Sequence, residues 1–103
     1  MRKLLYSSDA DDDIEGIKKY IGENLNSPKA AQNIVAKIRK RVRDLRRFPE
    51  MGAMLSSKFD VETDDRLLVC GNYIVIYHLE NKTVYVDRVF HGKRDYISIL
   101  FDE

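Results

Sequence analysis

The sequence predicts an α+β domain in which an N-terminal strand and an antiparallel pair of helices precede three strands. Through the first half, apolar residues recur every three or four positions, the spacing of amphipathic helices. After residue 65 the pattern changes to short runs rich in Val, Ile and Tyr, bounded by turn residues, which is typical of strands. We therefore expect the helical hairpin to cover one face of an antiparallel sheet, within a single domain spanning residues 1–103.

The first expected element is a short strand, KLLYS, from Lys3 to Ser7. Ser8 or Asp9 then offers a side-chain oxygen as the N-cap of a helix, and the acidic residues that follow favour the positive end of its dipole. Spacings of three and four residues place the apolar side chains of this helix along one face. They are Ala10, Ile14, Ile17, Ile21 and Leu25.

A second helix is expected to begin at Ser27 and Pro28, an N-cap residue followed by a first-turn proline, and to end before Pro49. Its apolar stripe consists of Ala31, Ile34, Val35, Ile38, Val42 and Leu45. From Lys29 to Arg47 eight residues are Lys or Arg and one, Asp44, is acidic. Such a face suits binding of nucleic acid or an acidic protein, and it also occurs as a merely solvated surface.

Three strands are expected in the second half, in RLLVCG, NYIVIYHL and TVYVDRVF. Gly71-Asn72 and Glu80-Asn81-Lys82 supply the turns of an antiparallel meander. The polar segment before them, residues 53–65, is compatible with a further strand or with a loop. Because the helices cover only one face, we expect the other face to be solvated and partly polar, and we expect function there.

Several classes of protein are excluded or disfavoured. The sequence contains no phosphate-binding loop, HExxH or GxSxG motif. The single cysteine, Cys70, lies in an apolar run and is expected to be a buried strand residue. The two histidines, His78 and His91, show no metal-ligand spacing, so neither a metal nor another cofactor is expected.

No apolar run is long enough to cross a bilayer, and the first residues lack the apolar core of a signal peptide. We therefore expect a cytoplasmic protein without a membrane partner.

The groups that remain for chemistry are cationic and aromatic, and several lie in DRVFHGKRDY, residues 87–96. Metal-independent RNA cleavage needs a base for the ribose 2′-hydroxyl, positive charge on the transition state and an acid for the leaving oxygen. The side chains available for these roles are Lys58, Arg66, Tyr77, Arg88, His91, Lys93, Arg94 and Tyr96. The same segment also fits a strand that ends in a polar turn, with Arg88 paired to a carboxylate. Both interpretations stay open on composition alone.

A set of short motifs adds a resemblance to these observations. They are A-x-x-D-I-x-x-I-x-x-Y-I from Ala10 to Ile21, P-x-x-A at Pro28 and Ala31, L-R-R-F-P-E-M-G from Leu45 to Gly52, Arg66 leading a strand, N-Y-I-V-I-Y from Asn72 to Tyr77, and R-V-F-H-G-K-R-D-Y from Arg88 to Tyr96. In order and spacing they resemble the RelE/ParE superfamily of toxins from bacterial type II toxin-antitoxin modules, over nearly the whole chain.

The resemblance implies the β-α-α-β-β-β fold predicted above and a growth-inhibiting protein that a cognate antitoxin keeps silent. RelE-like members cut mRNA on the ribosome without a metal, whereas ParE-like members are not nucleases and inhibit DNA gyrase. We expect ribosome-associated mRNA cleavage, with gyrase inhibition as the alternative. A third possibility is a degenerate module that only binds antitoxin, since Leu100 and Phe101 stand where nuclease members carry a tyrosine.

The resemblance also implies roles for individual residues. The expected catalytic residues are Arg66, His91, Arg94 and Tyr96. The residues expected to bind RNA are Lys58, Arg88 and Lys93. The charge pattern, rather than the resemblance, makes the basic second helix the expected antitoxin-binding surface, through Lys37, Arg41 and Arg43.

Overall fold

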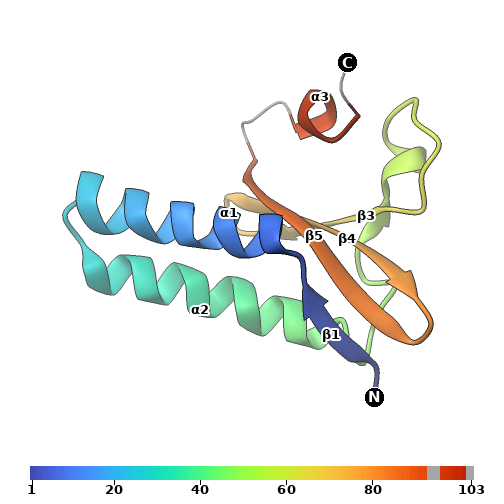
Figure 1. Ribbon diagram of the computed structural model, residues 1–103, viewed down its shortest axis with the longest axis horizontal. Coiled ribbons are helices and arrows are strands. Elements are labelled where there is room, and N and C mark those ends of the chain that lie inside the picture. The colour runs from blue at the N-terminus through green and yellow to red at the C-terminus, as the bar shows by residue number, and fades with distance from the viewer. Residues whose placement is uncertain (93–95, 102–103) are drawn as a thin grey trace.

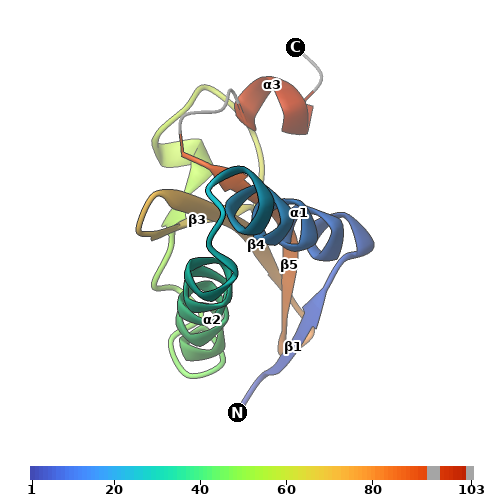
Figure 2. The ribbon, with the colours of Figure 1, turned by 90° about the vertical axis from the view of Figure 1, so that its left-hand side faces the viewer.

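The computed structural model describes residues 1–92 and 96–101. The first half contains strand β1 (Lys3–Tyr6), helix α1 (Ser8–Lys19), its π-helical continuation η1 (Tyr20–Asn24) and helix α2 (Pro28–Asp44). Figures 1 and 2 show α1 and α2 running side by side in opposite directions, which confirms the predicted hairpin. No helix in the described part of the chain is both long enough and apolar enough to cross a membrane.

Serine side chains begin both helices. Ser7, rather than Ser8 or Asp9, is the N-cap of α1, because its Oγ accepts a hydrogen bond from the backbone N–H of Ala10 at 2.9 Å. Ser27 caps α2 as predicted, and the proline after it occupies the first turn.

The second half completes a five-stranded sheet of order β1-β5-β4-β3-β2. The strands are β2 (Ala53–Met54), β3 (Arg66–Cys70), β4 (Tyr73–Glu80) and β5 (Thr83–His91). The last three form the predicted antiparallel meander, and the two-residue strand β2 lies on its edge. The sheet differs from the expectation at β1, which pairs with β5 in parallel and makes the sheet mixed.

The hairpin between β4 and β5 determines which side chains meet across these two strands. Its turn residues, Asn81 and Lys82, have positive φ angles of 49° and 62°, as a tight two-residue hairpin requires. The pairing register shifts between Ile76 and Tyr77, which leaves Asp87 as the extra residue of a β-bulge. Bulges re-aim the side chains beside them.

The main core lies between the helices and one face of the sheet, as predicted. Its buried members are Ala10, Ile14, Ile38, Val42, Leu45, Leu68, Cys70, Val75, Tyr77, Val84, Val86 and Val89. They come from both helices and from three neighbouring strands, so the helical hairpin is fixed on the sheet by apolar burial.

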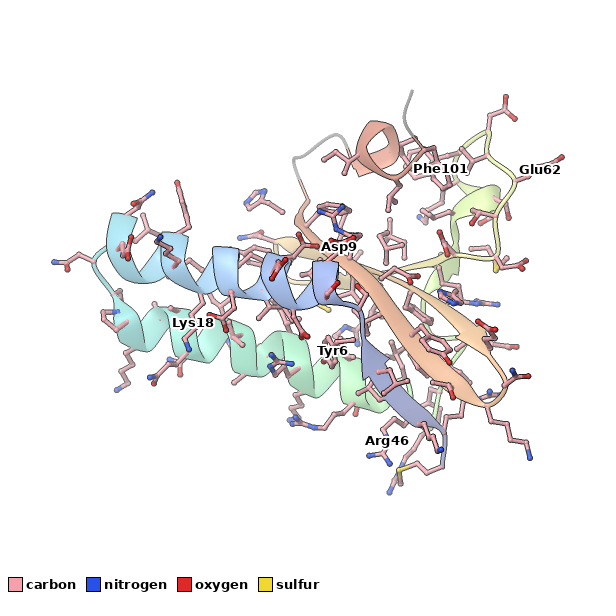
Figure 3. All side chains as sticks on the ribbon, in the orientation of Figure 1. Tyr6, Asp9, Lys18, Arg46, Glu62 and Phe101 are labelled. Carbon is pink, nitrogen blue, oxygen red and sulfur yellow. The ribbon has the colours of Figure 1, made fainter. Side chains whose placement is uncertain are left out.

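The opposite face is not the open, solvated surface that we expected. A second core lies there, formed by Leu55, Leu67, Ile74, Ile76 and Phe90. The 3₁₀ turn η2 (Leu55–Ser57) and helix α3 (Tyr96–Phe101), which the sequence did not predict, cover this core. Val61, in the segment that follows η2, and Phe101 of α3 both pack against it, and Figure 3 labels Phe101 on this side of the sheet. Apolar side chains on both faces of β3 and β4 therefore require cover on both sides.

Candidate functional site

The structure does not bring the predicted catalytic residues Arg66 and His91 together. Arg66 pairs with Tyr77 of β4, whereas His91 pairs with Tyr73 at the start of the same strand. A strand rises about 3.3 Å per residue and neighbouring strands lie about 4.8 Å apart, so the Cα atoms of Arg66 and His91 are roughly 16 Å apart. They lie toward opposite ends of the sheet, on either side of β4.

Both residues lie on the helix-covered face. Since side chains alternate along a strand, Arg66 shares a face with Leu68, and His91 shares a face with Val89. Leu68 and Val89 belong to the core beneath the helices. The expectation that the site lies on the opposite face therefore does not hold for these two residues.

Arg66 is held by backbone oxygens of the segment that follows α2. Its Nη1 donates to the carbonyl of Gly52 at 2.8 Å and to that of Glu50 at 3.4 Å. Beside it, the hydroxyl of Tyr77 donates to the carbonyl of Pro49 at 2.7 Å and accepts from the N–H of Gly52 at 2.9 Å. Burial raises the pKa of Tyr77, so its hydroxyl stays protonated near neutral pH. These contacts fasten residues 49–52 to the sheet.

His91 lines a groove of about 730 Å³ between α1 and the ends of β4 and β5. Its ring meets that of Tyr73 edge-on, with centroids 5.5 Å apart and planes at 79°. Tyr20 and Leu25 also line the groove, and these side chains are 58% and 61% exposed. Exposed apolar side chains around a groove are typical of a surface that binds another protein.

Arg88 is held by a carboxylate of α1. Its Nε donates to Oδ2 of Asp13 at 2.8 Å, and its Nη2 donates to Oδ1 at 3.0 Å. The backbone N–H of Val89 donates to the same Oδ2 at 2.9 Å. The bond to Asp13 raises the pKa of Arg88. Arg88 is thus paired with a carboxylate, and an RNA phosphate would have to compete with Asp13 for it.

The remaining residues of the predicted nuclease set are only partly described. Lys58 follows η2 and is exposed. Lys93 and Arg94 lie outside the described residues, and of Tyr96 only the backbone, at the start of α3, is described. Their expected roles stay predictions.

The three residues expected to bind antitoxin are all exposed on α2: Lys37, Arg41 and Arg43. Strand β2 pairs with only the first two residues of β3. Beyond it, Nε of Arg41 donates to the carbonyl of Val69 at 2.9 Å, and the Val69 side chain is 54% exposed. Positive charge and apolar surface therefore adjoin at this edge of the sheet.

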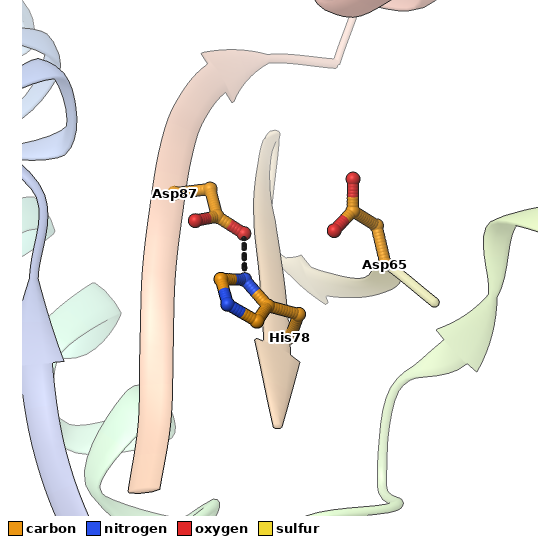
Figure 4. Close-up of side chains that lie close together, drawn as sticks. All are labelled: Asp65, His78 and Asp87. Carbon is orange, nitrogen blue, oxygen red and sulfur yellow. Dashed lines mark hydrogen bonds and ion pairs between the residues drawn. The ribbon is translucent and has the colours of Figure 1, made fainter. Parts of the chain in front are cut away.

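Sequence reasoning missed a group of side chains formed by Asp65, His78 and Asp87 (Figure 4). Nδ1 of His78 lies 2.7 Å from Oδ2 of Asp87, and one donor atom from each of the three residues lies within 4.8 Å of the others. The His78 ring stacks on Tyr85, with centroids 5.1 Å apart and planes at 12°. Its Nε2 lies 3.6 Å from a carboxylate oxygen of Glu80.

The charges of this group shift its protonation. Burial lowers the pKa of His78, but the hydrogen bond and charge of Asp87, with the charge of Asp65, outweigh burial and raise it. Burial raises the pKa of Asp87 more than His78 lowers it. The arrangement concentrates negative charge around a single imidazole.

The sequence of the β4–β5 hairpin is sufficient to predict that His78 and Asp87 lie close together. With Asn81 and Lys82 as the two turn residues, His78 faces Tyr85 across the strands, and Asp87 follows two positions later. Such diagonal cross-strand neighbours are within reach of each other. A search for ligand spacing along the sequence does not detect them, because their separation depends on where the turn lies.

The comparisons with known proteins agree with one another. The model of the family described as ParE toxin of type II toxin-antitoxin system, parDE, matches residues 4–96. The chromosomal ParDE TA system from P. aeruginosa is similar in structure, with a TM-score of 0.76 and 20% identity over 90% of this chain and 98% of that chain. No curated protein sequence matches.

A second similar structure is the toxin-antitoxin complex RelBE2 from Mycobacterium tuberculosis, with a TM-score of 0.64 and 20% identity over 87% of this chain and 96% of that chain. The two structures share the fold described above, and the family match covers nearly the whole chain, so the resemblance to the RelE/ParE superfamily is confirmed. The chain belongs to the ParE toxin family of type II toxin-antitoxin systems.

Proposed function

We propose that this type II toxin arrests growth by inhibiting DNA gyrase, the alternative to mRNA cleavage. The observation that supports the proposal most is the separation of Arg66 and His91 by roughly 16 Å, worked from their pairing with β4. A nuclease needs its base, its acid and its positive charge within hydrogen-bond reach of one phosphate. Arg66 and His91 lie toward opposite ends of β4. The Arg66 guanidinium is turned to the carbonyls of Gly52 and Glu50 while His91 lines the groove beside α1, so the two side chains do not converge in this structure.

The partners of the cations support the same proposal. Arg66 donates to backbone carbonyls, and Arg88 is held by both oxygens of Asp13. These bonds engage only some of the five N–H donors of each guanidinium, so a phosphate would either bind the remaining donors or displace the present partners. Hydrogen bonds to charged groups contribute about 1.5–3 kcal/mol each, so Asp13 competes with a phosphate for the donors of Arg88 that it already holds.

A protein target also suits the surface of the molecule. Tyr20 and Leu25 line the groove between α1 and the sheet, and both side chains are more than half exposed. Apolar surface of this kind is stabilised by contact with another protein. A protein target such as gyrase can bury apolar side chains against Leu25 as well as Tyr20.

Metal-independent, ribosome-associated mRNA cleavage is the second candidate. It is favoured by the presence of Arg66, His91, Arg94 and Tyr96, which the resemblance assigns to the nuclease branch. This candidate requires Arg94→Ala to abolish toxicity. The gyrase proposal instead expects Arg66→Ala to stay toxic wherever the variant protein remains folded.

The experiment is induction of the toxin in cells that lack antitoxin, followed by parallel analysis of DNA and mRNA. The proposal expects double-strand breaks in DNA, intact mRNA and partial protection in a host with a resistant gyrase. Message cut at ribosome-bound codons, with full sensitivity of the gyrase-mutant host, would reject it. Unimpaired growth would instead indicate a degenerate module that only binds antitoxin.

We further propose that a cognate antitoxin wraps the basic helix α2, with Lys37 and Arg41 on one flank and Arg43, about 160° around the helix from Arg41, on the other. These side chains are exposed, and Arg41 adjoins the exposed Val69. Exposed charges are screened by salt, so the affinity should fall as ionic strength rises. Lys37→Glu and Arg43→Glu should weaken binding, whereas Lys18→Glu on α1 is the matched control. A salt-independent affinity would contradict a basic interface.

A further inference from the structure

We propose that Asp65, His78 and Asp87 form a binding site for a divalent transition-metal ion, with Zn²⁺ as the expected ligand. The site lies at the end of the sheet where β3 begins and β4 ends, and it uses neither the groove at His91 nor the basic face of α2. Its test therefore does not depend on whether the toxin acts on gyrase or on mRNA.

The distances between the donor atoms suit a small cation. In a tetrahedral Zn²⁺ site with ligand bonds of about 2.0–2.2 Å, neighbouring donor atoms lie about 3.4 Å apart. Here one nitrogen and two carboxylate oxygens lie within 4.8 Å of one another, and the closest pair, His78 and Asp87, is 2.7 Å apart. Small side-chain rotations that move each donor atom by about 1 Å would widen the 2.7 Å separation between His78 and Asp87 and shorten any separation near 4.8 Å.

The backbone holds all three residues in place. Asp65 precedes β3, and its carbonyl accepts from the N–H of Leu55 at 3.0 Å. His78 lies within β4, opposite Tyr85. The bulge of β5 displays Asp87, whose carbonyl accepts from the hydroxyl of Ser7 at 2.8 Å. Figure 4 shows the two carboxylates on either side of the imidazole.

The surroundings of His78 also match those of a metal ligand. Metal-bound histidines usually direct their other ring nitrogen to a carboxylate, which fixes the tautomer and the ring orientation. When Nδ1 of His78 faces the metal, Nε2 points to Glu80, whose Oε2 is 3.6 Å away. Stacking on Tyr85 holds the plane of the ring.

The negative charge of Asp65 and Asp87 is not balanced by a lysine or arginine in the described part of the chain, which favours binding of a cation. Among the side chains that the structure describes, no lysine or arginine forms an ion pair with Asp65 or Asp87, and the only ion-pair partner of Asp87 is His78. Two carboxylates and a neutral imidazole carry a charge of −2, which one divalent ion would neutralise. An imidazole with two carboxylates favours Zn²⁺, Co²⁺ or Ni²⁺ over Mg²⁺ and Ca²⁺, which prefer oxygen ligands alone.

Three protein ligands leave the fourth position of a tetrahedral ion open. The His78 and Asp87 side chains are 29% and 30% exposed, so water can reach that position. Structural zinc sites are closed by four protein ligands, whereas sites with three bind water or an external ligand. This site belongs to the second kind, and an external donor atom from a partner protein could occupy the fourth position.

The test is calorimetric titration of Zn²⁺ into the untagged, chelator-treated full chain, with Co²⁺ absorption as a report of the coordination. We expect saturable binding of one ion and a tetrahedral Co²⁺ spectrum. Asp65→Asn and His78→Gln should each weaken binding by more than about tenfold, and Glu80→Gln by about tenfold. The matched controls are Asp64→Asn, next to Asp65, and His91→Gln.

Circular dichroism of each variant confirms that it is folded before its affinity is compared. Absence of saturable Zn²⁺ binding to the unmodified chain would overturn the proposal and would leave His78 and Asp87 as an ion pair. Equal affinity in Asp65→Asn, His78→Gln and their controls would overturn it as well, because the ion would then lie elsewhere. Preference for Mg²⁺ over Zn²⁺ would contradict the role of the imidazole.

Discussion

Replacing Asp13 by alanine is expected to lower the free energy of unfolding by about 3 kcal/mol. The Asp13 carboxylate accepts two hydrogen bonds from Arg88 and one from the backbone N–H of Val89, which together join α1 to β5. Its side chain is 13% exposed and that of Arg88 is 26% exposed. Breaking a buried pair costs about 3–5 kcal/mol, and partial exposure lowers the cost toward the bottom of that range.

The measurements are urea unfolding, which gives the free energy, and thermal unfolding, which gives Tm, both followed by circular dichroism, for Asp13→Ala, Arg88→Ala and the double variant. A domain of this size loses about 4–8 °C in Tm per kcal/mol, so Asp13→Ala should melt at least ~12 °C lower. The double variant should be less destabilised than the sum of the two single variants, because the singles break the same bonds. Asp12→Ala is the control, since Asp12 is exposed on the same helix and surface changes stay within about 0.5 kcal/mol.

An Asp13→Ala variant as stable as Asp12→Ala would refute this reasoning, and so would strictly additive effects in the double variant. Either result would mean that the pair contributes little in solution. Arg88 would then be available for a phosphate, and one argument against the nuclease candidate would be lost.

Three further predictions concern the core and the segment after α2. Tyr77→Phe removes the acceptor of the buried Gly52 N–H and should lower the free energy of unfolding in urea by about 1–3 kcal/mol. Tyr85→Phe is the control and should change it little, and equal urea midpoints for the two variants would contradict a stabilising role for the Gly52–Tyr77 hydrogen bond. Gly52→Ala places a Cβ 2.7 Å from the Tyr77 ring and 2.8 Å from the carbonyl oxygen of Leu67, so overpacking should lower the free energy of unfolding by about 1–3 kcal/mol. An unchanged Tm would contradict this, because it would mean that residues 49–52 shift without cost. Burial raises the pKa of Cys70 to about 11, which leaves a thiolate fraction of roughly 10⁻³ at pH 8. Iodoacetamide should therefore label the native chain at least ~100-fold more slowly than the urea-unfolded chain by mass spectrometry, and similar rates would contradict the burial.

Local patterns were sufficient to predict most of the fold. The apolar stripes, the Ser27-Pro28 start and the Asn81-Lys82 turn are properties of short segments, and the structure has each of them. Helix α3 was missed because it has only six residues and is stabilised by packing of Ile97, Leu100 and Phe101 on the second core. The parallel pairing of β1 depends on the path of the whole chain, which no local segment encodes.

The candidate site was less predictable, because it depends on register. Whether Arg66 and His91 meet is decided by their pairing with different ends of β4, and the sequence alone did not give that register. Asp13 and Arg88 are 75 positions apart, so their pairing follows only once α1 has packed on β5. The proximity of His78 and Asp87, in contrast, could have been predicted from the sequence, by pairing the residues of the two strands one by one from the turn at Asn81 and Lys82.

The central claim is that this toxin acts on gyrase and not on mRNA, and one measurement tests it most directly. Purified, antitoxin-free chain is added to gyrase, ATP and relaxed plasmid, and in parallel to a translating extract with a labelled message. The account predicts that supercoiling stops, that double-strand breaks appear after the proteins are denatured, and that the message stays intact. Unimpaired supercoiling at a toxin concentration that cuts the message at ribosome-bound codons would contradict it.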